Sequence, residues 1–375
     1  MKKCIVISDS FKGTISSLEI CRIARASIPK FFPQCQVLTV PVADGGEGTV
    51  DCFVEAIGAQ RVKAAVTGPY GEPIQVRYGR KDGCAIIEMA AAAGLPMVGE
   101  RRDPARTTTY GVGQLIAHAV EHGCREILLG LGGSATNDGG CGCAAALGVK
   151  FYNRQGEEFV PTGLTLDQIH KIDVSQARER LEGVTITVMC DVDNPLYGPR
   201  GAAHIFAPQK GADQDLVERL DQGLRKLDKA IQTSLNRSVA DLPGAGAAGG
   251  MGGGCVAFLG AQLKSGIESV LDTVGFDAML EGADLVITGE GRIDSQSVHG
   301  KVISGIAGRT KPRNIPLLAL VGGIAEDAAE GYDLGVTAMF SIDRSAQDFW
   351  EYAHKSAVYY QRTLEDILRL LKAVK

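Results

Sequence analysis

Polar and charged side chains gather in five glycine-containing loops, and most of these loops follow a short apolar run of the kind that forms a buried strand. The stretch GLGGSATNDGG, 130–140, comes directly after the run REILL. Its glycines let backbone N–H groups converge, and Ser134, Thr136 and Asn137 can hydrogen-bond to oxyanions or hydroxyl groups. We therefore expect this loop to bind part of a charged small molecule or a nucleotide.

A pair of carboxylates stands in the stretch PVADGGEGT, where Asp44 and Glu47 flank Gly45 and Gly46 at the start of an expected helix. Helix-dipole stabilisation alone would also select acidic residues there. The glycines around the two carboxylates favour a site for a metal ion or for hydroxyl groups, since hard cations prefer oxygen ligands.

Three further loops carry charged groups at expected strand ends, where parallel α/β sheets bind their ligands. SDSFKGT supplies Asp9 and Lys12, and CDVDNPLYG supplies Asp191 and Asp193. The stretch GEGRIDSQSVHGK, 289–301, contains Glu290, Arg292, Asp294, His299 and Lys301. Asp191 is a candidate base or magnesium ligand. Arg292 and Lys301 are candidate partners of a carboxylate or phosphate.

The stretch GAGAAG, 244–249, matches the G-x-G-x-x-G pattern of dinucleotide-binding domains. The residues before it, SVADLP, make a poor buried strand, and no acidic residue in a clear strand context follows about 20 positions on. We therefore reject a dinucleotide site and expect these glycines to hold phosphates at a helix start. FAPQKGA adds Gln209 and Lys210 as contacts to nucleotide or substrate.

Taken together, the loops supply carboxylates for Mg²⁺, fixed cations for anionic groups and glycine-rich backbone for phosphates. Phosphoryl transfer needs these three things and little covalent chemistry from the protein. The sequence has no Walker A pattern, no legible Ser-His-Asp arrangement and no Cys/His metal spacing.

The elements that position these loops alternate between strands and helices. The first four are expected at 4–10, 16–32, 36–44 and 48–59, a βαβα order that indicates a parallel sheet covered by helices. An antiparallel meander is expected over 66–89, and three strand-like runs recur at 283–291, 315–323 and 336–342. We therefore predict an α/β protein of two domains. A Rossmann-like parallel-sheet domain, 1–65 plus 281–375, is built from both chain ends, and a second α/β domain, 66–280, is inserted.

Composition excludes several classes of protein. The 375 residues carry a net charge of −5 without Lys/Arg runs, which argues against a nucleic-acid partner. Ten cysteines without a C-x-x-C pair are expected to be reduced thiols of a cytoplasmic protein. The N-terminal apolar run is too short for a signal peptide, and no stretch predicts a membrane span.

The chain resembles the type 1, bacterial, glycerate kinase family. The resemblance is carried in order along nearly the whole chain by DSFKGT, PVADGGEGT, IIEMAAAAGL, GLGGSATNDGG, CDVDNPLYGPRGAA, FAPQKGA, PGAGAAGGMG, LKSGIE and VITGEGRIDSQSVHGK. It implies ATP-dependent phosphorylation of D-glycerate, two α/β domains with one inserted in the other, and a site in the cleft. It favours 2-phosphoglycerate as product over the 3-phospho isomer. The chain could also form a homo-oligomer.

We assign roles on physical grounds. Asp191 or Asp294 accepts the hydroxyl proton, Lys12 neutralises the phosphoryl charge, and Asp44 and Glu47 hold Mg²⁺. Substrate contacts are expected from Asp9, Arg292, Lys301, Ser134 and Asn137. Phosphate contacts are expected from Gly132, Gly133, Thr136, Gly246, Gly249, Gly250 and Lys210. The alternatives are an NAD(P)-dependent hydroxy-acid dehydrogenase and a sugar-acid binding protein without catalysis. The number of carboxylates argues against a pure anion binder, because like charges repel.

Overall fold

The computed structural model describes residues 1–375 except 12, 44, 47, 295–301, 345–352 and 375. The chain forms two compact units, described separately here. The first unit contains Met1–Ala43, Asp51–Gly58 and Ser265–Lys375, and the second contains Asp44–Val50 and Ala59–Lys264. The predicted fold class is confirmed, because a parallel-sheet domain draws strands from both chain ends and an α/β domain is inserted between them. The predicted boundaries at 65 and 281 stay a prediction.

The first unit is built on a five-stranded sheet in the order β16-β14-β12-β1-β2, and all its strand pairs are parallel. Its strands are β1 (Lys3–Ser8), β2 (Gln36–Pro41), β12 (Leu285–Thr288), β14 (Leu317–Val321) and β16 (Ala338–Ser341). A short parallel pair joins β13 (Arg292–Ile293) to β15 (Gly323–Ile324). Residues from the two chain ends are therefore neighbours in one sheet.

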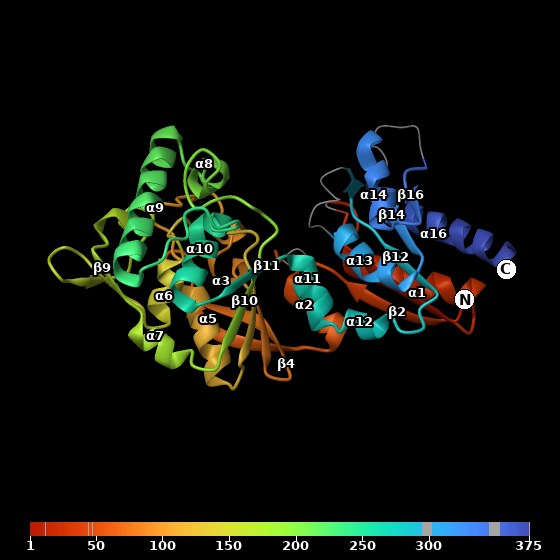
Figure 1. Ribbon diagram of the computed structural model, residues 1–375, viewed down its shortest axis with the longest axis horizontal. Coiled ribbons are helices and arrows are strands. Elements are labelled where there is room, and N and C mark those ends of the chain that lie inside the picture. Colours follow the sequence, from red (N-terminus) through yellow and green to blue (C-terminus); the bar gives the residue numbers. More distant parts are fainter. Residues whose placement is uncertain (12, 44, 47, 295–301, 345–352, 375) are drawn as a thin grey trace. The chain divides into compact units, whose positions relative to one another are not determined.

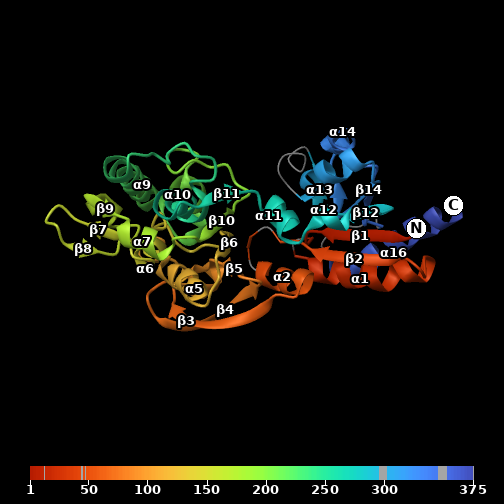
Figure 2. The same cartoon turned by 60° about the horizontal axis from the view of Figure 1, so that its bottom comes forward.

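Helices cover both faces of this sheet. The helices of this unit are α1 (Ser17–Phe31), α2 (Thr49–Ile57, whose first two residues belong to the second unit), α11 (Gly266–Thr273), α12 (Phe276–Met279), α13 (Val302–Thr310), α14 (Glu330–Leu334) and α16 (Ser356–Ala373). Helix α1 begins at the N-cap Ser16, whose hydroxyl accepts from the Glu19 N–H. The apolar sides of α1 and α16 form one core with alternate residues of β1 and β12. Figure 2 shows α1 and α13 on opposite sides of the sheet.

The second unit is built on a six-stranded sheet in the order β11-β10-β6-β5-β4-β3. Its strands are β3 (Gln60–Thr67), β4 (Pro73–Lys81), β5 (Cys84–Glu88), β6 (Glu126–Gly130), β10 (Thr185–Met189) and β11 (Gln262–Lys264). Strands β3, β4 and β5 pair antiparallel, which confirms the meander expected from the sequence. The remaining pairs are parallel, so β5, β6 and β10 end at the same edge.

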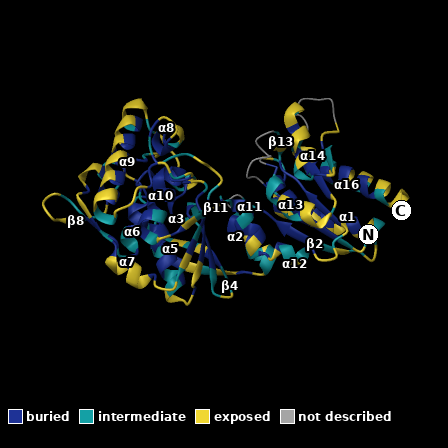
Figure 3. Ribbon diagram, in the orientation of Figure 1, coloured by how far each residue is buried: buried dark blue, intermediate teal, exposed yellow. Residues whose placement is uncertain are grey.

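The rest of the second unit packs around that sheet (Figure 1). The helices are α3 (Ala90–Ala93), α4 (Leu95–Val98), α5 (Tyr110–Glu121), α6 (Cys141–Ala146), α7 (Ser175–Arg180), α8 (Ala202–Phe206), α9 (Gln214–Leu235) and α10 (Ala247–Leu259). A small antiparallel sheet, β8-β7-β9, contains β7 (Lys150–Tyr152), β8 (Glu158–Phe159) and β9 (Lys171–Asp173). Its inner side shares a core with α9 and α10, and the outer side of α9 is exposed (Figure 3).

Candidate active site

Three loops of the second unit leave the central sheet at one place. Glu88 at the end of β5, Gly130 at the end of β6 and Met189 at the end of β10 are register partners across the sheet. The loops after these strands therefore start side by side at the carboxyl edge, where parallel sheets bind ligands. Two of them are loops that the sequence singled out, 130–140 and 190–198.

The side chain of Asp138 stabilises the conformation of the 130–140 loop through hydrogen bonds. Its carboxylate is fully buried and accepts from the Thr109 N–H and hydroxyl, both at 2.8 Å, and from the N–H groups of Gly140 at 3.1 Å and Gly142 at 3.2 Å. Burial raises the pKa of Asp138, while these hydrogen bonds act in the opposite direction. The loop is thereby anchored to the start of α5 and to α6.

Two glycines of this loop are required by a close backbone approach. The Gly132 N–H donates to the Gly45 carbonyl at 3.1 Å. A β carbon at Gly130 would lie 2.2 Å from the Gly45 oxygen, and one at Gly132 would lie 2.5 Å from the Gly46 Cα. The Gly45–Gly46 turn thus packs directly on the 130–132 backbone, and Asp44 and Glu47 flank that turn in the sequence.

Lys210 is a buried cation at this edge of the sheet. It ends the 3₁₀ turn Pro208–Lys210, and its side chain is only 2% exposed. Its ammonium group donates to the Ser134 hydroxyl at 2.8 Å and to the Thr136 carbonyl at 2.7 Å. Burial lowers the pKa of Lys210 from 10.5 to about 7, and the charge of Asp138 acts in the opposite direction. An anion beside this group would restore its charge.

Thr136 and Asn137 of the 130–140 loop are buried, and their side chains have polar atoms without hydrogen-bond partners in the described chain. Within the described residues, the Thr136 hydroxyl and both amide atoms of Asn137 have no hydrogen-bond partner. Leaving such a group unpaired costs about 1–3 kcal/mol, and few native groups remain so. These atoms therefore need a partner from outside the described part of the chain, such as water or a ligand.

The first turn of α10 contains three consecutive residues with left-handed backbone conformation. Ala248, Gly249 and Gly250 all have positive φ, at 53°, 67° and 91°. Gly249 must be a glycine for a second reason, because a β carbon there would lie 2.0 Å from the Thr136 oxygen. The left-handed conformation of Ala248 costs about 1–2 kcal/mol. Strain of this kind gathers at ligand-binding sites, which makes this segment a candidate.

A pocket of about 370 Å³ is lined by Lys210, Ser134 and Ala248, whereas Thr136 and Asn137 are not among its lining residues. Its polar lining comes from Ser134, Asp191, Gln209 and Lys210, and its backbone lining includes Gly132, Gly133, Ala247 and Ala248. Leu95, Leu131, Met189, Val192 and Phe206 form apolar walls. A compact apolar pocket with a few converging polar groups is the usual form of a small-molecule site. Gly246, Gly249 and Gly250 stand just before and after the lining residues of α10.

Two of the predicted loops of the first unit are joined by hydrogen bonds. The Asp9 N–H donates to the Gly289 carbonyl at 2.9 Å, and the Ser8 hydroxyl donates to the same oxygen at 2.9 Å. The loop that carries Asp9 is thus joined to the loop that leads into Arg292 and Asp294. Both loops follow parallel strands at the carboxyl edge of their sheet.

Four predicted site residues lie outside the described part of the chain, namely Lys12, Asp44, Glu47 and Lys301, as does His299 of the 289–301 stretch. Among the described residues, no group of three or more His, Cys, Asp or Glu could hold a metal ion. Asp193 forms an exposed ion pair with Arg200 at 3.0 Å. No helix in the described ranges is long and apolar enough to cross a membrane.

Sequence reasoning did not single out the supporting roles of Asp138 and Ala248. Asp138 was visible only as one polar residue among several in a glycine-rich loop, and a buried carboxylate has no local signature. The segment around Gly244–Gly249 does not follow a strand, in agreement with the rejection of a dinucleotide fingerprint.

Comparisons with known proteins identify relatives over nearly the whole chain. The family model described as "Glycerate kinase family" matches residues 4–372. A Bacillus cereus protein named "Glycerate kinase" is 45% identical over 95% of this chain and 94% of its own length. An Escherichia coli protein named "Glycerate 2-kinase" is 45% identical over 91% of this chain and 90% of its own.

A solved structure agrees with these relatives. The crystal structure titled as a putative glycerate kinase 2 from Salmonella typhimurium LT2 is 41% identical and superposes with a TM-score of 0.87, covering 99% of this chain and 98% of that one. Such similarity in sequence and in fold shows that the chain belongs to the glycerate kinase family.

Proposed function

We propose that this enzyme transfers the terminal phosphoryl group of ATP to D-glycerate in the presence of Mg²⁺, and that 2-phosphoglycerate is the product. A glycerate hydroxyl forms the new O–P bond, the bond from that phosphorus to the ADP oxygen breaks, and the hydroxyl proton passes to a carboxylate. The single observation that carries the proposal is the buried ammonium of Lys210, held on Ser134 and Thr136 at the wall of an open pocket.

Lys210 has the properties of a preformed phosphate anchor. An ammonium group has three N–H donors, and two of them are used by Ser134 and Thr136. A buried cation is unfavourable without an anion, and a phosphate oxygen supplies one in the pocket that Lys210 lines. Gly132, Gly133, Thr136, Gly246, Gly249 and Gly250 are proposed to complete the phosphate contacts, in part through backbone N–H groups.

Asp191 is proposed as the base, with Asp294 of the first unit as the alternative. Asp191 lines the same pocket as Lys210 and Ser134, directly after β10. A general base must lie within hydrogen-bond reach of the hydroxyl it deprotonates, so a residue on the wall of the substrate pocket is favoured. Ser134, Asn137, Asp9, Arg292 and Lys301 are the proposed contacts of glycerate.

Mg²⁺ is proposed to bind at Asp44 and Glu47. Carboxylate oxygens suit a hard cation, and the Gly45–Gly46 turn between these two residues packs on the 130–132 backbone. When bound, the ion would neutralise charge on the phosphate groups. Lys12 is proposed to do the same for the transferring phosphoryl group. The meeting of ATP and glycerate between the two domains is part of the proposal and rests on the family resemblance. A cytoplasmic location and a homo-oligomer also remain proposals.

A coupled ADP-release assay with D-glycerate, followed by phosphorus NMR of the product, tests the proposal. The 2-phospho isomer couples its phosphorus to one proton and gives a doublet, whereas the 3-phospho isomer couples it to two protons and gives a triplet. ADP release that needs both glycerate and Mg²⁺, together with a doublet, is expected. A triplet would reassign the product, and glycerate binding without ADP release would remove the kinase activity.

A further inference from the structure

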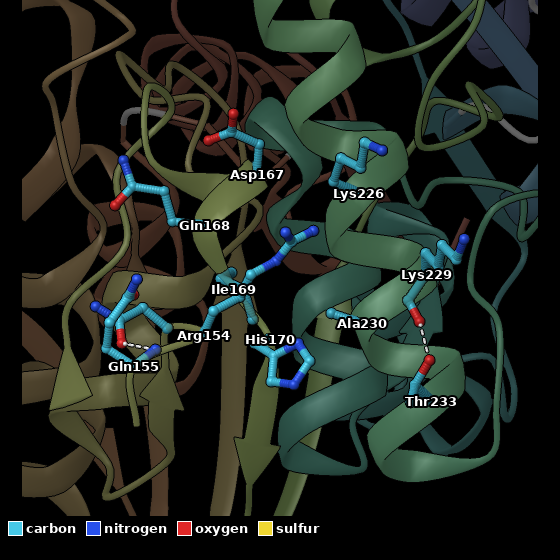
Figure 4. A pocket seen from close by; sticks show the side chains of 11 residues that line it. Arg154, Gln155, Asp167, Gln168, Ile169, His170, Lys226, Lys229, Ala230 and Thr233 are labelled. Carbon is cyan, nitrogen blue, oxygen red and sulfur yellow. Dashed lines mark hydrogen bonds between the residues drawn. The ribbon is translucent and has the colours of Figure 1, made fainter. Parts of the chain in front are cut away.

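A second hollow, of about 690 Å³, lies in the second unit between the β8-β7-β9 sheet region and α9. Figure 4 shows its lining side chains, which come from the turn after β7, from the segment before β9 and from one side of α9. None of these residues lines the pocket of Lys210 and Asp191. The hollow is therefore distinct from the candidate active site.

Positive charge dominates this hollow. Arg154, Lys226 and Lys229 line it, and in the described chain none of the three has a carboxylate within 4.0 Å of its side-chain nitrogens. Asp167 is the one acidic residue in the lining. Arg154, Lys226 and Lys229 thus line the hollow together with one carboxylate, in a protein whose net charge is −5.

The neighbouring acidic residues are already engaged with other groups. Glu158 pairs with Lys150 at 3.8 Å, and Glu157 accepts from the Asn153 amide at 2.8 Å. Asp173 accepts from the Ser175 N–H at 2.9 Å. None of these three carboxylates pairs with Arg154, Lys226 or Lys229 in the described chain, so the lining keeps an excess of positive side chains, and such a concave surface attracts and concentrates small anions.

We propose that this hollow binds a small organic anion that carries a phosphate monoester. Lys226 and Lys229 are three positions apart on α9, so both project from the same side of the helix. Arg154 extends from the turn after β7 toward α9 (Figure 4). A guanidinium fork binds two oxygens of one phosphate, and the two ammonium groups supply point charges for the remaining negative charge.

The rest of the lining suits the organic part of such a ligand. Gln155 and Gln168 offer amide donors and acceptors, whereas the Asn153 amide is already bonded to Glu157. The Thr233 hydroxyl donates to the Lys229 carbonyl at 2.9 Å and can still accept. These neutral groups can hydrogen-bond to carboxylate or hydroxyl oxygens. The volume falls in the range of small-molecule sites, which is larger than one inorganic ion requires.

Isothermal titration calorimetry on the full-length enzyme tests the proposal with two probes, inorganic phosphate and phosphoglycolate. The test variant is Lys226→Gln/Lys229→Gln. The matched control is Lys63→Gln/Arg77→Gln, which removes the same charge from exposed cross-strand neighbours on β3 and β4. Arg154→Gln, on the opposite wall, serves as a second test variant if the α9 variant fails to fold.

Phosphoglycolate is expected to bind the wild type and the control alike, more tightly than inorganic phosphate does. The α9 variant should bind it at least about tenfold more weakly, since each lost charged hydrogen bond is worth about a tenfold change. Equal affinity in all three proteins would place the anion elsewhere and overturn the proposal. So would phosphate that binds as tightly as phosphoglycolate, or an absence of binding to the wild type.

Discussion

Replacing the buried lysine by methionine, Lys210→Met, should change how the stability of the free enzyme depends on pH. The pKa of Lys210 falls from 10.5 to about 7 on folding because burial disfavours the charged form. Between these two values the unfolded chain holds a proton that the folded chain has released. The free energy of unfolding contributed by Lys210 therefore rises with pH across this window, at up to about 1.4 kcal/mol per pH unit.

The magnitude follows from the same two pKa values. At pH 7 half of the folded molecules hold the proton, so the slope begins at half its maximum and is nearly full by pH 8. From pH 7 to pH 9 the wild type should therefore gain about 2 kcal/mol relative to Lys210→Met. Methionine keeps the length of the side chain and carries no proton. The loss of the bonds to Ser134 and Thr136 adds an offset that this titration does not change.

Urea denaturation of both proteins at pH 7, 8 and 9 measures this difference. Taking wild type minus variant at each pH cancels the other titrating groups. Lys63→Met, an exposed lysine on β3, controls for the loss of a lysine as such. A difference that stays constant within about 0.5 kcal/mol from pH 7 to pH 9 would refute the assignment of a depressed pKa to Lys210.

The remaining predictions concern three other side chains. Asp191→Asn should lower kcat by about 10²–10⁴-fold with little change in the KM for glycerate, and an unchanged kcat would remove Asp191 as base. Arg292→Ala should raise the KM for glycerate by about tenfold or more, and an effect on ATP alone would reassign this residue. Asp138→Asn should lower the free energy of unfolding by at least about 2 kcal/mol, because one acceptor oxygen of the buried carboxylate becomes an NH₂ group that meets the same N–H and O–H donors. The control Asp193→Asn breaks only the exposed pair with Arg200 and should cost under about 1 kcal/mol, and equal losses would contradict the role of Asp138.

The sequence predicted those parts of the fold and site that depend on local pattern. Apolar runs followed by glycine-rich loops located the ends of β1, β6 and β10, because a buried strand and the turn after it are both visible in a few residues. The recurrence of such runs after Ala283 indicated that both chain ends share one sheet, and β1 does pair with β12.

Features that depend on distant contacts were not visible. Lys210 was one polar residue in FAPQKGA, and its burial arises from bonds to Ser134 and Thr136, more than seventy positions away. The glycines of the 130–140 loop were interpreted as ligand-binding. Gly130 and Gly132 also have a packing reason, the approach of the Gly45–Gly46 turn. A sequence does not distinguish a glycine that is required by a ligand from one that is required by the close packing of another backbone segment.

Asp138 and Lys210 are both buried ionisable residues at the carboxyl edge of β6, and their surroundings are related. The carboxylate of Asp138 is occupied by donors of its own loop and of Thr109, so it acts on Lys210 through its charge, and burial outweighs that effect. The ammonium group is therefore fixed in position by neutral oxygens and left without an anion at hydrogen-bond distance among the described residues. Hydrogen-bond donors that are fixed before the ligand binds need no reorganisation when charge develops on a phosphoryl group. Such preorganised electrostatic stabilisation is the largest contribution to the rate enhancement of many enzymes. If Lys210 anchors a phosphate of ATP as proposed, the cost of burying this lysine in the free enzyme and the gain on binding ATP are two consequences of the same arrangement.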